Sequence, residues 1–507
     1  MSDAILNGPA QGGATLDCAA LAGASAEPSE RSSTDTPLAR LAFQLYVAIG
    51  VGVFLLMMVV GALFRATQAA FAPIPANFAY ELMTLHGAGM VGVSGLAGSA
   101  VMWYFLRRYV ALSTGMFLAM LSLSLVGVVM ILAAIGLGRF AGGWTFLYPL
   151  PANSMGVWGP HAAAAFVGGL VFIGVGFLLF YFDCAAAILR RFGSLARALG
   201  LDQLFGMRPL DTSLPPTVVA STMVIIVNII GILAGAVVLV MSLVNIYVPS
   251  LVFDALLMKN LIFFFGHVFI NATIYMAVIG VYEIVPRYSG RPWLINKAFL
   301  ASWAAVTLMV MAVYPHHLLM DFVMPKWMAV TGQVLSYLSG IPILLVTAYG
   351  ALVNIHRSNL KWDLPLRLLI FGLFGWAAGV LPAIVDGVVR VNQVMHNTQW
   401  VPGHFHFYLL LGLVPLLLGA LLHACTRSGW TEGPLDRLAF WTYGVAGTLF
   451  CVVFLAAGRR GVPRRFAIHD DAWIGFAQVG AIAASLVVLA AVALGVRLLA
   501  RVPRASL

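Results

Sequence analysis

Charged side chains are scarce in this sequence. The 507 residues include only 28 Lys and Arg and 18 Asp and Glu, which is 9% of the chain, whereas 62% are hydrophobic. A soluble chain carries about 25% charged residues. This shortage excludes a soluble enzyme, a disordered chain, a coiled coil and, despite the net charge of +10, a nucleic-acid-binding protein. The apolar side chains need a lipid bilayer as their solvent.

Cysteine is equally sparse. The four cysteines lie far apart in the chain, at Cys18, Cys184, Cys425 and Cys451, and no CxxC pair occurs. This spacing indicates neither a disulfide framework nor a cysteine metal site. It also excludes a CxxCH haem attachment site and a cysteine cluster for a dinuclear copper centre.

Long uncharged runs divide most of the chain. Twelve runs reach a length that spans a bilayer as a helix, and a span in hydrocarbon must satisfy its own backbone polar groups. The sequence therefore predicts an all-α integral membrane protein with twelve transmembrane helices in one domain at 40–501. Residues 1–39 are predicted to be a disordered cytoplasmic tail, and 502–507 a short cytoplasmic tail. The runs are 41–64, 82–106, 109–138, 140–182, 212–253, 260–282, 298–320, 327–356, 368–385, 391–426, 438–458 and 472–496.

The Lys and Arg residues are distributed unevenly between the two ends of the predicted bundle. Nineteen of the 28 fall on the side of the chain termini. Positive charge collects on the cytoplasmic side, so both termini are predicted to be cytoplasmic in a bacterial-type inner (plasma) membrane. Four of the remaining nine crowd into 459–465 on the outer side, which the orientation rule does not explain.

Six histidines fall in or at the ends of the predicted spans. An ionisable residue inside a span is costly and therefore indicates a functional site. With the spans alternating in direction, most of the six are expected in the outer half of the membrane, with His267 deeper. They are His86, His267, His316, His317, His404 and His406.

The spacing of these histidines indicates how they divide among metals. His404 and His406 are two residues apart, so on a helix they point about 200° away from each other and serve different partners. Pro315 precedes the adjacent pair His316-His317, and a locally broken helix would turn both rings toward one ion. His267 would supply a third nitrogen. Three imidazole nitrogens suit iron, copper or zinc and leave an open position, which is typical of a reactive metal.

Several motifs around these histidines resemble the catalytic subunit (subunit I) of the haem-copper oxidase superfamily, over nearly all of the chain after residue 40. The segment VNQVMHNTQWVPGHFH at 391–406 is similar to the helix IX–X segment of the B-type oxidases. Further matches are TLHG around His86, FFFGH ending at His267, YPHHLL at 314–319, GGWTFLYPLP at 142–151 and GVPRRF at 461–466.

The resemblance implies two haems and a second metal. His86 and His406 would be axial ligands of a low-spin haem, and His404 the proximal ligand of a high-spin haem. His267, His316 and His317 would hold copper, or non-haem iron in nitric oxide reductases. Arg464 and Arg465 match arginines that bind haem propionates, which suits the fork of a guanidinium group and accounts for the basic cluster. His396 and Asp386 match residues near the propionates.

The sequence departs from the family pattern at Asn271. In A- and B-type oxygen reductases this position, four residues after the histidine, is a tyrosine joined covalently to that histidine. In C-type enzymes the tyrosine lies six residues before the histidine pair, which is Val310 here. Tyr275 and Tyr314 are the nearest substitutes. An asparagine cannot be oxidised in place of the tyrosine.

This departure favours nitric oxide as the substrate. Coupling two NO molecules to N2O and water takes two electrons and two protons and needs no redox-active tyrosine. The sequence therefore predicts a respiratory haem-copper-type reductase that reduces NO, with the reduction of O2 by a cytochrome c oxidase as the alternative. A transporter or a haem-handling protein would also span the membrane, but neither needs this set of histidines.

Partner and proton-transfer residues follow from the same resemblance. Besides a small gas and membrane lipid, the predicted partner is a separate electron-donating subunit, cupredoxin-like or cytochrome c-type, on the outer face near Arg464 and Arg465. Lys259 and Asn260 are expected at a subunit contact or at the membrane interface. The residues that resemble a B-type proton pathway are Tyr282, Glu283, Thr331, Ser336, Tyr337 and Thr347.

Overall fold

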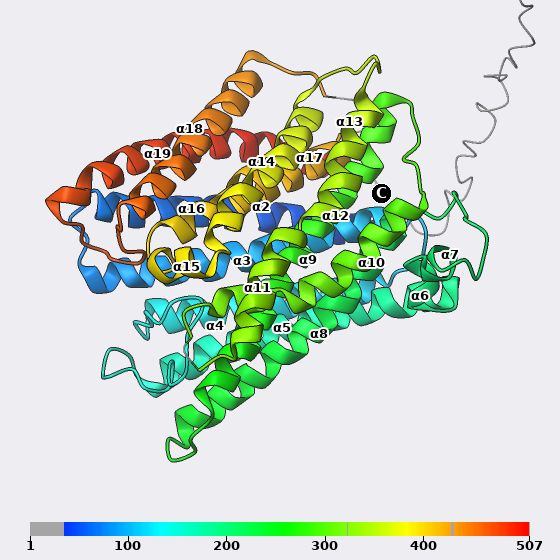
Figure 1. Ribbon diagram of the computed structural model, residues 1–507. Helices are drawn as coiled ribbons and strands as arrows, with labels where there is room; N and C mark the ends of the chain where they lie inside the picture. The colour runs from blue at the N-terminus through cyan, green and yellow to red at the C-terminus, as the bar shows by residue number, and fades with distance from the viewer. Residues whose placement is uncertain (1–34, 322, 427–429, 506–507) are drawn as a thin grey trace, which may run out of the picture.

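The computed structural model describes residues 35–321, 323–426 and 430–505, and within these residues the chain is helical and forms no strand. Twelve helices are long and apolar enough to cross a membrane, which confirms the predicted multi-pass all-α protein (Figure 1). They are α2 (Pro37–Gln68), α3 (Ala76–Leu106), α4 (Thr114–Gly136), α5 (Pro160–Phe192), α8 (Pro216–Tyr247), α9 (Ala255–Ser289), α10 with the 3-10 turn η1 (Lys297–Leu318), α11 to α13 (Lys326–Ile355), α14 (Leu364–Asp386), α16 to α17 (Trp400–Ala424), α18 (Pro434–Arg459) and α19 (Asp471–Leu499).

The remaining helices are short and lie in the connections. They are α6 (Leu195–Ala198), α7 (Leu201–Leu204), α15 (Val389–Met395) and the 3-10 turn η4 (Val502–Arg504). The first span begins at Pro37, three residues before the predicted boundary at 40, because the Thr36 side chain caps it by accepting a hydrogen bond from the Ala39 amide at 3.1 Å. The tail predicted before it lies largely outside the described residues.

Two uncharged runs begin well before their helices, so the absence of charge overestimates the helix length there. The run 140–182 becomes helical only at Pro160, because Gly142, Gly143 and two prolines interrupt its first part. The run 391–426 contains the short α15, a turn, and then the span that starts at Trp400. Both non-helical segments belong to the connections at the end of the bundle opposite to the termini. We call this the outer end, following the predicted orientation.

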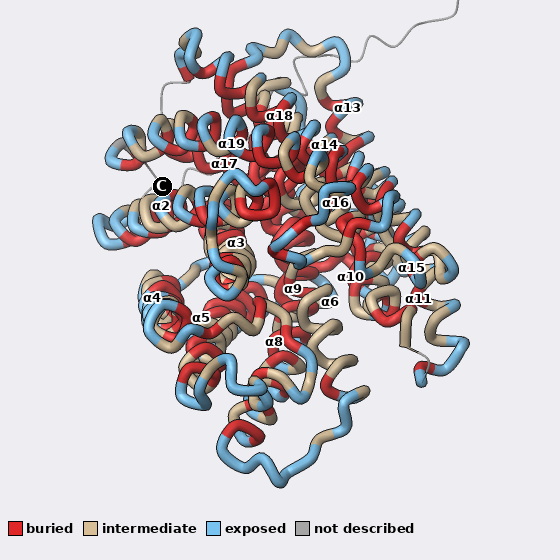
Figure 2. Tube along the Cα trace, turned by 90° about the vertical axis from the view of Figure 1, so that its left-hand side faces the viewer, coloured by how far each residue is buried: buried red, intermediate tan, exposed pale blue. Residues whose placement is uncertain are grey.

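Neighbouring spans pack in pairs around an interior of large apolar side chains. The α4–α5, α8–α9 and α18–α19 pairs are in contact, and α19 closes the bundle by packing on α2 (Figure 1). Trp103, Trp303 and Tyr181 are fully buried. Buried segments concentrate where helices meet, and exposed ones lie on outward faces and loops (Figure 2). Outward residues such as Val129 and Leu489 are apolar, as lipid contact requires.

Three spans are irregular, and all three carry predicted site residues or line their surroundings. α10 ends at Ala312 and gives way to η1 (Tyr314–Leu318). The eighth span passes from α11 (Lys326–Leu338) and α12 (Ile341–Leu344) through a π-helix η2 (Leu345–Tyr349) to α13 (Gly350–Ile355). The tenth passes from α16 (Trp400–His406) through a π-helix η3 (Phe407–Leu413) to α17 (Val414–Ala424). Such interruptions are frequent at functional sites.

An ion pair between a buried carboxylate and a partly exposed guanidinium group ties α18 to α19 at the end that carries the termini. Both Asp436 carboxylate oxygens accept hydrogen bonds from Arg497 at 2.8 Å, and Asp436 is 1% exposed. The indole of Trp430 donates to the same carboxylate at 3.2 Å, and the Arg497 guanidinium lies 5.1 Å from the Trp430 ring centroid. This carboxylate has its hydrogen bonds satisfied by two separate segments.

Replacing Asp436 by alanine is expected to lower the free energy of unfolding by about 2 kcal/mol, because the hydrogen bonds that Arg497 and Trp430 donate to the carboxylate are lost. A fall in the thermal unfolding midpoint of the purified protein in detergent measures this. The control is Arg437→Gln, which removes a 60% exposed guanidinium 3.7 Å from Glu432 and should change the midpoint little. Equal midpoints for Asp436→Ala and wild type would contradict the structural role.

Candidate functional site

One cavity of about 450 Å³ brings together all of the predicted site residues. It lies toward the outer end, among α2, α3, α9, η1, α11, α14, α16 and α18. A volume of this size is typical of cofactor sites. The predicted residues that line it are His86, His267, Asn271, His316, His317, Asp386, His396, His404, His406, Arg464 and Arg465.

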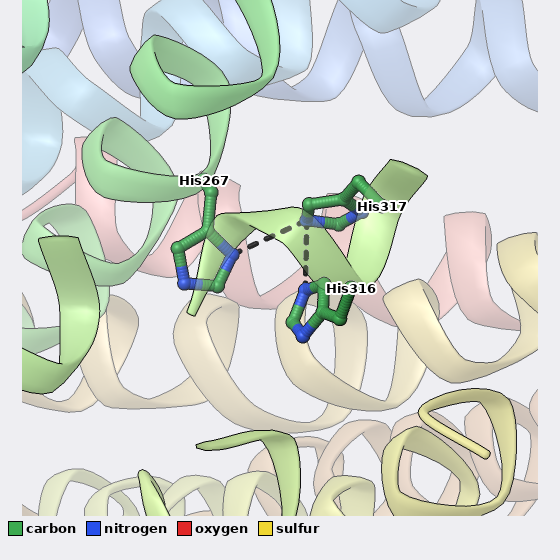
Figure 3. Close-up of side chains that lie close together, drawn as sticks. All are labelled: His267, His316 and His317. Atoms are coloured by element: carbon green, nitrogen blue, oxygen red, sulfur yellow. Dashed lines mark hydrogen bonds between the residues drawn. The ribbon is translucent and has the colours of Figure 1, made fainter. Parts of the chain in front are cut away.

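Three histidines in the cavity wall present nitrogen atoms to one point. One ring nitrogen from each of His267, His316 and His317 lies within 4.8 Å of the others, as a shared metal ion requires (Figure 3). The Nδ1 of His267 is 3.2 Å from the Nε2 of His317, which is 3.0 Å from the Nε2 of His316. The adjacent pair converges because η1 replaces the α-helix after Ala312. Three imidazoles without a fourth protein ligand suit a reactive metal.

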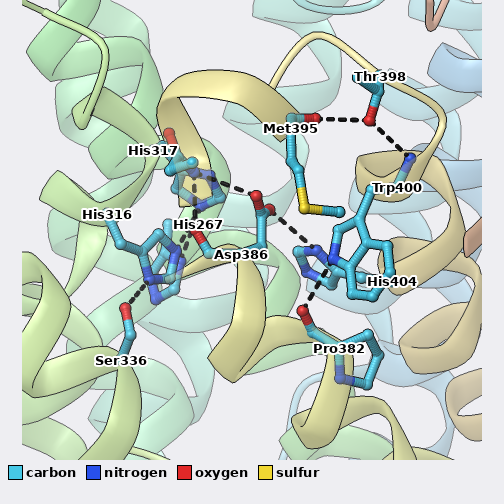
Figure 4. Close-up of polar contacts among 11 residues, drawn as sticks. His267, His316, His317, Ser336, Pro382, Asp386, Met395, Thr398, Trp400 and His404 are labelled. Carbon is cyan, nitrogen blue, oxygen red and sulfur yellow. Dashed lines mark hydrogen bonds and ion pairs between the residues drawn. The ribbon is translucent and has the colours of Figure 1, made fainter. Parts of the chain in front are cut away.

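His316 is held by the eighth span. Its Nδ1 lies 2.7 Å from the Ser336 hydroxyl, which itself donates to the Gly332 carbonyl at 2.7 Å (Figure 4). Since that hydroxyl proton is already used, Nδ1 of His316 must be the donor, and its Nε2 keeps a lone pair for a metal. A Cβ at Gly332 would lie 2.8 Å from the His316 amide nitrogen, so only glycine lets α11 approach this closely.

Asn271 contacts His267, one turn earlier on α9. Its amide nitrogen donates to the His267 carbonyl at 2.8 Å and lies 3.2 Å from the ring Nε2. The ring therefore has Nδ1 toward the other two histidines and Nε2 toward the asparagine. Asn271 occupies the place where the resemblance led us to expect a tyrosine, and it reaches the same ring through a hydrogen bond.

His404 lies on α16 beside a buried carboxylate. Its Nδ1 is 3.4 Å from Asp386 Oδ2, so this ring nitrogen faces the carboxylate (Figure 4). The amide of Asn392 holds that carboxylate by donating to Oδ1 at 3.1 Å and to the Asp386 carbonyl at 2.8 Å. The Tyr408 ring packs edge-on against His404 with centroids 5.7 Å apart.

His86 and His406 both have one ring nitrogen fixed by the backbone. The Nδ1 of His86 is 2.8 Å from the Met57 carbonyl, and that of His406 is 2.6 Å from the Pro402 carbonyl. A carbonyl only accepts, so both rings must carry their proton on Nδ1 and keep a lone pair on Nε2. Gly61 makes room for His86, because a Cβ there would lie 2.4 Å from the ring. This donor set fits an axially ligated haem.

The arginine pair lies at the mouth of the cavity. The amide of Arg464 donates to the Asn397 carbonyl at 2.9 Å, and Arg465 donates to the Thr145 hydroxyl at 3.2 Å. Burial lowers the pKa of Arg464 to about 10, and Arg465 adds to this effect. Burial, with Arg464 next in effect, also lowers the pKa of His396 to about 4, so this ring is neutral at pH 7. Two adjacent guanidinium groups here suit carboxylate groups of a ligand.

Arg65 is a residue of this cavity that the sequence did not single out. It is 2% exposed, and its hydrogen-bond acceptors are neutral: the Gln68 side chain at 2.7 Å and the Phe476 carbonyl at 3.2 Å. Its guanidinium lies 4.5 Å from the Phe454 ring centroid, and that ring stacks on His406 at 5.4 Å. The sequence offered one indication of its role, a single arginine just after an uncharged run. We had included it only among the nine Lys and Arg residues counted on the outer side.

The predicted proton-transfer residues form two separate groups. Glu283 accepts from Tyr109 at 2.8 Å and from Thr217, and pairs with Arg108 at 3.3 Å and Arg287 at 3.7 Å. Three hydrogen-bond donors and one further guanidinium group thus surround this carboxylate. The Tyr282 and Thr347 hydroxyls share a hydrogen bond of 2.6 Å. Of the predicted group, only Ser336 lines the cavity, and Thr331 and Tyr337 do not.

The two substitute tyrosines are placed differently. Tyr275 lines the cavity and packs edge-on against Trp303 with centroids 5.5 Å apart. Tyr314 does not line the cavity and donates to the Asn260 side chain at 3.0 Å. Tyr408, which we had not considered, also lines the cavity.

Comparisons with known proteins agree with this architecture. The family model described as Cytochrome C and Quinol oxidase polypeptide I matches residues 42–491. Cytochrome c oxidase subunit 1 of Debaryomyces hansenii is 23% identical over 249 residues, which cover 46% of this chain and 44% of that protein. The same subunit of Cereibacter sphaeroides is 22% identical over 266 residues, or 50% and 46% of the two chains. The match thus spans less than half of each relative.

A solved structure extends the likeness to nearly the whole fold. A haem-copper terminal oxidase dimer determined by cryo-electron microscopy superposes with a TM-score of 0.77 at 18% identity, covering 92% of this chain and 84% of that one. At this identity the likeness establishes the fold. Because the family model covers most of the sequence and the fold agrees, this chain belongs to the haem-copper oxidase subunit I family, cytochrome c and quinol oxidase polypeptide I.

Proposed function

We propose that this chain is the catalytic subunit of a respiratory haem-copper-type reductase that converts nitric oxide to nitrous oxide. The observation that supports NO is the contact of Asn271 with His267, at the position where oxygen reductases of A- and B-type carry a cross-linked tyrosine. Val310, at the C-type position, also lines the cavity and cannot be oxidised. NO reduction consumes two electrons and two protons per pair of NO molecules, and both electrons can come from the metals.

The donor set assigns each cofactor to its residues. His86 and His406 would hold a low-spin haem, His404 a high-spin haem, and His267, His316 and His317 copper or non-haem iron. Arg464 and Arg465 would bind the haem carboxylates. When bound, these groups supply the electron transfer and the Lewis acidity of the reaction.

The protein's own groups position and protect the reacting gas. Asp386 orients His404, Ser336 orients His316, and Asn271 keeps the Nδ1 of His267 toward the metal position. Apolar walls that include Phe263, Ile270 and Val310 keep bulk water out of the cavity. The Asn271 amide faces the His267 carbonyl and Nε2, so it acts on the reaction through the orientation of this ring.

Electrons would enter from a separate subunit at the outer end. A cupredoxin-like or cytochrome c-type partner suits the loop that follows the arginine pair, because Phe466 and Ile468 there are 51% and 73% exposed. Protons would enter from the opposite end of the bundle. The Tyr282–Thr347 pair on spans six and eight supports such a route toward Tyr275 at the cavity wall.

Oxygen reduction by a cytochrome c oxidase is the second candidate, and Tyr408 is the observation that favours it. This ring lies against His404 and lines the cavity, so it could take the part of the missing tyrosine. If oxygen were the substrate, Tyr408→Phe would abolish O2 uptake and leave haem content normal. If NO is the substrate, we expect Tyr408→Phe to retain most of the N2O formation.

Replacing Asn271 by tyrosine is expected to lower N2O formation about tenfold or more, because the ring fills space beside His267 and the amide contact that orients the His267 ring is lost. Anaerobic N2O formation and O2 uptake, measured on the same preparation, check this. Asn271→Glu tests whether a proton-carrying group is tolerated, and Asn245→Ala, an asparagine outside the cavity, is the control. Unchanged N2O formation in Asn271→Tyr would contradict the role given to Asn271.

A further inference from the structure

The segment that carries His316 and His317 has little helical support of its own. α10 ends at Ala312, η1 spans five residues, and α11 starts only at Lys326. His267, in contrast, lies inside the continuous helix α9. The contact with Ser336 of α11 holds His316, and the distance between the histidine pair and His267 depends in addition on side-chain contacts that join this segment to α9.

The first such contact is an ion pair. The Lys259 ammonium lies 2.6 Å from the Asp321 carboxylate, and the two side chains are 28% and 21% exposed. Lys259 is eight residues before His267 on α9, about 12 Å along the axis. Asp321 follows His317 by four residues. The ion pair thus joins α9 to the residues immediately after the histidine pair.

The second contact lies on the N-terminal side of the histidine pair. The side-chain oxygen of Asn260 accepts a hydrogen bond from the Tyr314 hydroxyl at 3.0 Å, and Tyr314 precedes His316 by two residues. The Asn260 amide is fixed in turn by donating to the Leu256 carbonyl at 2.9 Å. Phe264 packs edge-on against Tyr314 at 5.5 Å. Two consecutive residues of α9 therefore bind both flanks of the histidine pair.

We propose that Lys259 and Asn260 are positioning residues that hold His316 and His317 near His267 before a metal arrives. This inference rests on the proposed metal role of the three histidines. Ligands that are already converged lose less conformational freedom on binding, so the metal is held more tightly. The sequence had suggested a subunit contact or a place at the membrane interface for Lys259 and Asn260, and the structure adds contacts of both side chains within this chain.

The test is metal retention in the purified, haem-loaded protein. Lys259→Met and Asp321→Asn are each expected to weaken retention of the metal about tenfold, as for other residues that orient ligands. Tyr314→Phe loses one neutral hydrogen bond and should weaken it about fivefold. Elemental analysis of metal per chain, after dialysis against a graded series of chelator concentrations, measures these changes. Lys326→Met, an exposed lysine at the same end, is the control and should match wild type.

Exchanging the two charges tests whether the loss of metal in the single variants comes from the loss of the ion pair itself. The double variant Lys259→Asp with Asp321→Lys restores an ion pair and should recover most of the metal retention that either single variant loses. Wild-type retention in Lys259→Met, Asp321→Asn and Tyr314→Phe would overturn the proposal. If a charge variant also lost its haems, its metal content would no longer be informative, and the proposal would then stand or fall with the metal retention of Tyr314→Phe, which keeps the ring. A wild-type protein with haem but no metal would contradict the proposed function itself.

Discussion

Replacing His317 by alanine is expected to remove the non-haem metal and abolish gas turnover while the low-spin haem is retained. The Nε2 of His317 lies between the other two ligand nitrogens, 3.0 Å from His316 and 3.2 Å from His267, so no remaining side chain can replace it. The loss of affinity should exceed the 10- to 100-fold typical of outer-shell substitutions.

Elemental analysis together with reduced-minus-oxidised optical spectra measures this result. The metal content should fall while the absorbance of a low-spin haem stays, because His86 and His406 belong to other segments. The matched control is His161→Ala, an exposed histidine whose ring contacts Tyr247 and does not line the cavity. Normal metal content in His317→Ala would contradict the assignment of the three-histidine site.

His86→Ala is expected to produce the opposite pattern, in which the low-spin haem is lost and the metal is kept. The His86 ring is fixed by the Met57 carbonyl and lies in space that only glycine at position 61 leaves open, and alanine supplies no nitrogen in place of its Nε2. Turnover with an external electron donor should fall to background, since electrons would no longer reach the gas-binding site. Spectra that keep the low-spin bands in this variant would exclude His86 as an axial ligand.

The sequence predicted the spans and the six histidines from strong local signals, whereas the other predicted cavity residues came from the resemblance to a family. Uncharged runs identify spans, since each charge in hydrocarbon is costly. The spacing of His404 and His406 predicted two different partners, and Pro315 predicted the break that lets His316 and His317 converge. The absence of charge could not show where glycine and proline delay the start of a helix within an uncharged run, as at 140–159.

What the sequence could not predict are contacts between side chains that lie far apart in the chain. Lys259 and Asp321 are 62 residues apart and look like two ordinary charges near span ends until the fold joins them. Ser336 was interpreted as a proton-transfer residue, but its hydroxyl orients His316. Arg65 looked like a charge at a membrane surface, although it is buried beside Phe454. Pairings of this kind require the three-dimensional arrangement.

The measurement that tests the central claim most directly is the gas turnover of the purified wild-type protein. Under anaerobic conditions, with an excess of an electron donor, we expect one N2O to form for every two NO consumed, and in a separate assay we expect O2 uptake to be far slower. Rapid O2 uptake, with NO left unconsumed, would contradict the proposed function and assign the chain to oxygen reduction.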